Sequence, residues 1–157
     1  MKFYSLNGQS PHVSFAEATL HGQAPDKGLY FPEAIPSLPS HLVKNIKKYA
    51  KEELGVEVMK PYVEGSIPLN KLEEIVSETV NFDFPLVAIN DRILSLELFG
   101  GPTLAFKDVG ARFMSRCLAY FNQNKSKTTT VLVATSGDTG GAVANGFLGV
   151  DGVDVVI

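Results

Sequence analysis

Residues 131–142, VLVATSGDTGGA, predict a buried strand that ends in a turn rich in glycine and hydroxyl groups and is followed by a helix. Glycines let backbone N–H groups approach a ligand closely, and Thr135, Ser136 and Thr139 can donate hydroxyl hydrogens. The start of the helix also favours negative charge. The turn is therefore a candidate site for a carboxylate or phosphate, although Ser136 or Asp138 could also be ordinary N-caps that need no ligand.

The same turn does not fit the common nucleotide-binding motifs. No Walker lysine follows it, and the G-x-G-x-x-G spacing is absent. A carboxylate is therefore the favoured ligand.

A second candidate lies about thirty residues earlier, where residues 97–108, ELFGGPTLAFKD, place a lone lysine behind an apolar run at a predicted helix start. Desolvation and the helix dipole would both disfavour the charged form of Lys107, and a neutral amine attacks carbonyls. Lys107 is therefore a candidate for forming a Schiff base. The alternative is a solvated lysine of the first helical turn, paired with Asp108.

Together, the two segments resemble the active-site halves of the threonine synthases, pyridoxal-phosphate enzymes of the fold type shared with the tryptophan synthase β-subunit. Residues 98–108 resemble the cofactor-lysine signature of that family, and residues 136–140 resemble its substrate loop. Residues 4–8, 15–18 and 26–32 resemble its opening domain, so the resemblance spans nearly the whole chain. One departure is Gly100, where many members carry a histidine.

The resemblance implies a role for each matching residue. Lys107 would hold pyridoxal 5'-phosphate as a Schiff base and would move protons during the reaction. Asp138 would lie near the hydroxyl of the cofactor ring. The substrate carboxylate would be bound by the turn, at Thr135, Ser136, Gly137 and Thr139.

Arg112 is a further candidate, for the phosphate of the substrate. It follows Asp108 by one turn of the same predicted helix, and an ion pair at i, i+4 spacing explains it equally well. We favour the ion pair.

The implied reaction converts O-phospho-L-homoserine and water to L-threonine and phosphate, the last step of threonine biosynthesis. The enzyme would be a carbon–oxygen lyase acting on phosphate. Two other interpretations stay open: a related amino-acid dehydratase or β-replacement enzyme with the same cofactor, and a non-catalytic anion-binding module. The long opening segment before the lysine favours a threonine synthase over the related dehydratases and β-replacement enzymes.

Composition limits the possible partners. The chain has 157 residues, 45% of them apolar, and a net charge of −3, and it shows no basic stripe for nucleic acid or an anionic membrane. Its densest basic cluster, Lys44, Lys47, Lys48 and Lys51, is expected on the polar face of one helix. The sequence shows neither a membrane span nor an export signal, and its three histidines follow no metal-ligand spacing. The lone Cys117 is expected in the core of a cytoplasmic protein.

Hydrophobic periodicity and turn residues predict the elements of the chain. We expect helices over 14–21, 40–54, 69–80, 109–121 and 142–147, strands over 2–4, 28–31, 130–134 and 153–157, and a hairpin of 86–89 with 93–98. Pro61 argues against an unbroken helix between 57 and 67.

This order of elements predicts an α/β fold. A mixed α+β domain over 1–85 would precede the beginning of an open and mostly parallel three-layer αβα sheet domain over 86–157. The resemblance implies that the first is the opening domain of the threonine synthases and the second the beginning of their PLP-binding domain. The strand at 153–157 has nothing after it to cover its faces, so we expect a truncated domain, an N-terminal part of the enzyme. Alone, the chain should be inactive, bind the cofactor weakly or not at all, and self-associate through this strand.

Overall fold

The computed structural model describes residues 1–123, 128–135 and 137–157. It divides into two compact units, Met1–Ser77 and Glu78–Ile157, which we describe separately. The predicted domain boundary after residue 85 stays a prediction. None of the described helices is long and apolar enough to cross a membrane.

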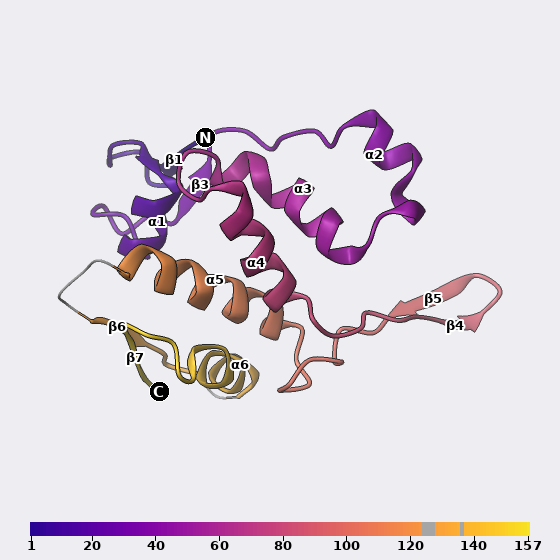
Figure 1. Ribbon diagram of the computed structural model, residues 1–157. Coiled ribbons are helices and arrows are strands. Elements are labelled where there is room, and N and C mark those ends of the chain that lie inside the picture. Colours follow the sequence, from indigo (N-terminus) through magenta and orange to yellow (C-terminus); the bar gives the residue numbers. More distant parts are fainter. Residues whose placement is uncertain (124–127, 136) are drawn as a thin grey trace. The chain divides into compact units, whose positions relative to one another are not determined.

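The first unit begins with a small antiparallel sheet. Strand β1 (Lys2–Ser5) lies between β2 (Val13–Ser14) and β3 (Tyr30–Pro32). Strands β1 and β3 of this sheet are labelled in Figure 1. Helix α1 (Phe15–His21) follows β2 directly, because Ser14 and Glu17 form a capping box that satisfies N–H groups at its start. These elements enclose a core of Phe3, Val13 and Ala18. The structure confirms the strand and helix predicted here, while the two-residue β2 was not predicted.

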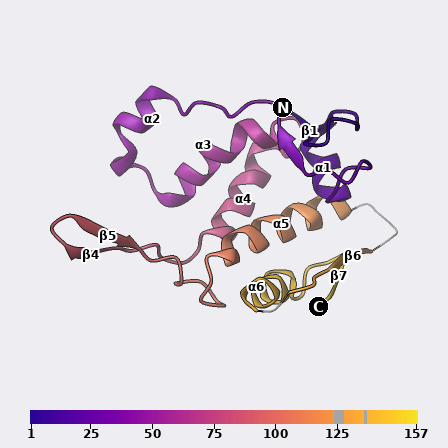
Figure 2. The same ribbon diagram turned by 180° about the vertical axis from the view of Figure 1, so that it is seen from behind.

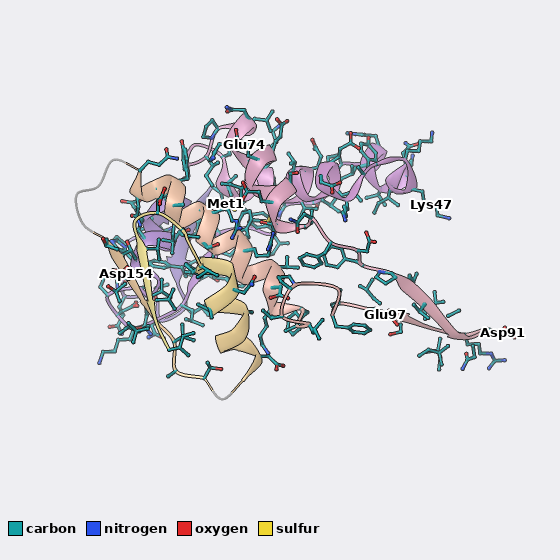
Figure 3. The ribbon with its side chains drawn as sticks, turned by 60° about the horizontal axis from the view of Figure 1, so that its bottom comes forward. Met1, Lys47, Glu74, Asp91, Glu97 and Asp154 are labelled. Carbon is teal, nitrogen blue, oxygen red and sulfur yellow. The ribbon has the colours of Figure 1, made fainter. Side chains whose placement is uncertain are left out.

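The helix predicted over 40–54 is wrong. The structure has instead α2 (Ser40–Lys44), a 3₁₀ turn η1 (Ile46–Lys48) and the start of α3 (Lys51–Val63). The break occurs because Tyr49 and Ala50 are extended, and the Glu53 carboxylate accepts a hydrogen bond from the Ala50 N–H at 2.8 Å, starting a new helix. The four clustered lysines therefore do not share one helix face; Lys47 lies on the exposed η1 (Figure 3).

The expectation from Pro61 is also wrong, because α3 runs through this residue. Proline removes one N–H from the helical ladder, but Pro61 lies in the last turn, and the helix ends two residues later at Val63. The next helix, α4 (Leu69–Thr79), confirms the amphipathic prediction, since Leu72, Ile75 and Val76 are buried.

The second unit starts with the predicted hairpin, β4 (Leu86–Asn90) and β5 (Ile93–Leu96). Its turn is held by the Asn90 side-chain oxygen, which accepts hydrogen bonds from the N–H groups of Arg92 and Ile93. All residues of β4 are exposed. Within this unit the hairpin projects away from the helices, with Asp91 at its tip (Figures 2 and 3).

The rest of the second unit is a β-α-β arrangement beside a long helix. Helix α5 (Lys107–Asn122) precedes β6 (Thr129–Leu132), α6 (Asp138–Phe147) and β7 (Val153–Val156). Strands β6 and β7 pair in parallel, and α6 packs against α5. This confirms the predicted parallel strands, although α6 begins at Asp138 rather than at residue 142.

Candidate functional site

The first part of the site is the loop that leads into α5. Lys107 is the first residue of this helix, as predicted. The loop turns back on itself, because the Leu104 N–H donates to the Gly101 carbonyl at 3.1 Å. Leu104 has a φ of +59°, a left-handed conformation that costs a leucine about 1 kcal/mol or more and is therefore held by its surroundings.

Asp108 holds this loop from the other side of the lysine. Asp108 is 1% exposed, and its carboxylate accepts two hydrogen bonds from Thr103, from the N–H at 2.9 Å and from the hydroxyl at 2.6 Å. The residue after Lys107 is therefore tied to the loop before it.

Two adjacent glycines make room for this arrangement. A Cβ at Gly101 would lie 2.5 Å from an oxygen of the Asp108 carboxylate. A Cβ at Gly100 would lie 2.7 Å from the carbonyl oxygen of Asp83. Both distances are shorter than real Cβ contacts, so side chains at these positions would displace the loop.

The second part of the site is the turn between β6 and α6. The Gly137 N–H donates to the Thr135 hydroxyl at 3.3 Å, and Asp138 is the first residue of α6. A Cβ at Gly140 would lie 2.5 Å from Cγ2 of Thr135, so this glycine lets the helix start lie against the end of the strand segment. Thr139 lies in the exposed first turn. Ser136 lies outside the described residues.

The structure brings the two parts together. The amine Nζ of Lys107 lies 3.9 Å from Oδ2 of Asp138. The amine thus faces the start of α6, where the first N–H groups of a helix lack partners within the helix and attract anions. Asp108, the alternative partner of the lysine, binds Thr103 instead.

The expected dry environment of the lysine is not found in this chain. The Lys107 side chain is 38% exposed and that of Asp138 is 76% exposed. The neighbours of the amine are themselves open to solvent: Phe106, whose ring centroid lies 5.4 Å from Nζ, is 61% exposed.

Arg112 does not form the favoured pair with Asp108 in its described contacts. Its guanidinium donates to the Glu78 carbonyl at 2.6 and 3.2 Å and to the Asn81 side chain at 3.1 Å. Burial lowers the pKa of Arg112, and the positive charge of Arg116 lowers it further. The structure therefore places Arg112 at a structural contact between α5 and the segment that precedes the hairpin.

The remaining candidates are structural. Cys117 is fully buried, as predicted, and this burial raises the pKa of its thiol to about 12. Within residues 1–123, 128–135 and 137–157, no group of three His, Cys, Asp or Glu side chains could hold a metal ion.

Sequence reasoning missed the link between Asp108 and Thr103. An aspartate beside a lysine is usually interpreted as its ion-pair partner. The available signal was the spacing of Thr103 and Asp108 across a helix start, where a side chain in the first turn can accept a hydrogen bond from the preceding loop.

Comparisons with known proteins agree on one family. A family model described as "Threonine synthase N terminus" matches residues 2–80. The chain is 38% identical over 157 residues to the threonine synthases of Haemophilus influenzae and Escherichia coli, and it spans 36% of the length of each.

Solved structures give the same result. The chain superposes with a TM-score of 0.92 on PLP-bound threonine synthase from Brucella melitensis, at 36% identity, covering 99% of this chain and 34% of that one. For threonine synthase from Escherichia coli the TM-score is 0.90 at 37% identity, covering 99% of this chain and 36% of that one. These matches confirm the predicted α/β fold class.

Proposed function

The chain belongs to the threonine synthase family, and we propose that it is the N-terminal part of an enzyme that converts O-phospho-L-homoserine and water to L-threonine and phosphate. The enzyme would be a pyridoxal-phosphate-dependent lyase. The relatives that carry this name are about three times as long as the chain, which spans 36% of their length, so the remaining parts of the site would come from later residues.

One observation supports this proposal most directly. Lys107 and the turn before α6 are separated by about thirty residues, yet the amine lies 3.9 Å from the Asp138 carboxylate. An amine that reacts with an aldehyde and a turn that binds an amino acid's carboxylate must be neighbours for the two to act on one substrate.

The amine of Lys107 and the carboxylate of Asp138, 3.9 Å apart, are groups that could hold the cofactor of the family. Pyridoxal phosphate would supply an electron sink for a carbanion of the substrate. Lys107 would bond to it covalently and carry protons on Nζ, and Asp138 would face the polar edge of its ring. The substrate carboxylate would be bound by the turn, at Thr135, Ser136, Gly137 and Thr139.

Arg112 has a different place in this proposal. To reach a substrate phosphate, it would have to exchange its contacts with the Glu78 carbonyl and Asn81. We therefore assign it to holding α5 and leave the substrate phosphate to other groups.

The test is a substrate comparison with the full-length protein. Phosphohomoserine should yield threonine and phosphate in equal amounts, while threonine and serine should not be consumed at a comparable rate. Lys107→Ala should abolish turnover. Preferential consumption of serine or threonine would instead indicate a dehydratase or β-replacement enzyme, and no reaction with any of them would favour the anion-binding module.

The chain on its own should behave differently. Because the Lys107 side chain is 38% exposed, a cofactor bonded to it would be only partly enclosed by this chain, and we expect weak or no binding. A visible absorption band after adding pyridoxal phosphate, lost in Lys107→Ala, would contradict this expectation. We also propose a cytoplasmic location, consistent with the reduced and buried Cys117, which cell fractionation can test.

A further inference from the structure

We infer that Asp108 is a positioning residue for Lys107: its buried carboxylate, bound to Thr103 and packed against Gly101, fixes the direction in which the lysine leaves α5. The inference rests on the proposed function, because it assigns a task to the residues around the proposed cofactor lysine.

The first argument is burial. Asp108 is 1% exposed, and a buried carboxylate is costly unless it accepts hydrogen bonds. Both of its oxygens accept from Thr103, one from the N–H and one from the hydroxyl, while Lys107 contacts Asp138 instead. The Asp108 carboxylate thus forms its hydrogen bonds within the loop and is not the ion-pair partner of the neighbouring Lys107.

The second argument is the close fit around the carboxylate. The carboxylate of Asp108 lies close to the backbone at position 101, and only glycine permits this. A Cβ added at Gly101 would lie 2.5 Å from Oδ2, 3.0 Å from Cβ and 3.1 Å from Cγ of Asp108. Leu104, between the two bonded residues, is held at a φ of +59°. Contacts that impose a strained conformation on an exposed leucine also restrict the backbone that carries Lys107.

The third argument is geometric. Thr103 precedes Lys107 and Asp108 follows it, so their hydrogen bonds close a ring of backbone that contains the lysine. Within this ring the Cα–Cβ direction of Lys107 is fixed, and the amine needs only its own side-chain rotations to reach Asp138. Loss of the ring would let the amine move, and misplacement of a reacting group by about 1 Å can cost roughly 100-fold in rate.

The test compares three variants of the full-length holoenzyme. Thr103→Val keeps the shape but removes the hydroxyl donor, and Asp108→Ala removes both bonds. Asp108→Asn can keep both, since its amide can accept from the Thr103 N–H and donate to the Thr103 hydroxyl. The matched control is Thr19→Val in α1, which removes a side-chain hydrogen bond of 2.9 Å to the Phe15 carbonyl in the first unit.

We expect Thr103→Val and Asp108→Ala to lower kcat by roughly 10- to 100-fold with little change in KM. They should also lower the fraction of Lys107 that borohydride traps with the cofactor, measured by peptide mass spectrometry. Asp108→Asn should stay within about threefold of the wild type in both. Thr19→Val should lower the Tm while leaving kcat and trapping unchanged.

Other outcomes would overturn the inference. If Thr103→Val lowered the Tm with unchanged kcat and trapping, the contact would be merely structural. If Asp108→Asn were as impaired as Asp108→Ala, the charge and not the geometry would matter. An inactive wild type would contradict the proposed function and not this inference, because the trapping measurement reports on the lysine independently of the substrate.

Discussion

At the scale of single residues, Gly100 and Gly101 explain how the lysine loop can lie against its neighbours. At Gly100 the atom that a side chain would meet is a backbone oxygen, that of Asp83, which cannot rotate away. A side chain at position 100 would therefore require a different path for this segment.

We predict that Gly100→Ala lowers the free energy of unfolding of the chain by about 1–3 kcal/mol, the range for forcing atoms into a well-packed site. Gly110→Ala is the matched control, because a Cβ there meets no atom within 4 Å and alanine favours a helix. Urea denaturation followed by circular dichroism measures both. Equal stability of the two variants would show that the Asp83 carbonyl can move at little cost.

Asp26 is a residue whose charge matters for the first unit. Its pKa is lowered to about 2, first by the hydrogen bond from the Ser5 hydroxyl at 2.6 Å and then by bonds from the N–H groups of Gly28 and Gln9. Because the folded value lies below the ordinary value of 3.8, the stabilisation is present above that value. It is lost as the pH falls towards about 2.

We therefore predict that the urea concentration at the unfolding midpoint of the chain decreases as the pH is lowered from about 5 to about 2. This decrease should be smaller in Ser5→Ala. The pKa of Glu17 is also lowered, by hydrogen bonds from Ser14, so this carboxylate contributes to the acid dependence in the same direction. Glu17→Gln is therefore a necessary second variant. A pH dependence unchanged by Ser5→Ala would contradict the role given to this hydrogen bond.

At the scale of elements, α5 and α6 form the base on which both parts of the site rest. Gly146 of α6 lies against Ala111 in α5, where a Cβ would lie 3.1 Å from the Ala111 carbonyl carbon, a closer contact than most real Cβ atoms make. The Arg116 guanidinium donates to the Gly146 carbonyl at 2.7 Å and to the Glu78 carboxylate at 3.0 Å. Gly146 and Arg116 therefore both take part in the contact between the two helices.

We predict that Arg116→Met lowers the free energy of unfolding by about 1.5–3 kcal/mol, the range for hydrogen bonds made by a charged group. Arg92→Met, in the exposed hairpin turn, is the control and should change it by less than about 0.5 kcal/mol. Chemical denaturation provides the measurement. The account of the helix pair would be wrong if both substitutions had the same effect.

Helices and strands were predictable from the sequence where a single local signal, such as hydrophobic periodicity, had no competing interaction. The strong 3.6-residue period of α4 and the strand, turn and helix around Asp138 are examples. The break at Tyr49 was not predictable from periodicity, because the capping interaction of Glu53 with Ala50 competes with continuing the helix. At the site, the expectation that Lys107 lies near the turn at Asp138 came from the family resemblance of the two segments, whereas the Asp108 contact depends on the folded loop.

At the scale of the whole molecule, the described surface of the second unit carries much apolar area. Val156 and Ile157 at the end of β7 are 55% and 62% exposed, and Leu132 at the end of β6 is 77% exposed. Exposed apolar residues on strands that offer unpaired backbone groups favour association between copies.

We predict that the 157-residue chain self-associates in a concentration-dependent manner and that Val156→Asp weakens this association. Val43→Asp is the matched control, because Val43 is also 55% exposed but lies in α2 of the first unit. Static light scattering measures the mean mass of each variant. A monomeric wild type, or equal effects of the two substitutions, would contradict a role for β7.

The central claim is that Lys107 is the residue that bonds to the cofactor. Borohydride reduction of the full-length protein with pyridoxal phosphate, followed by peptide mass spectrometry, tests it most directly. We predict a reduced cofactor adduct on the peptide that contains Lys107, absent in Lys107→Ala. An adduct on another lysine, or an adduct that persists in Lys107→Ala, would contradict the account.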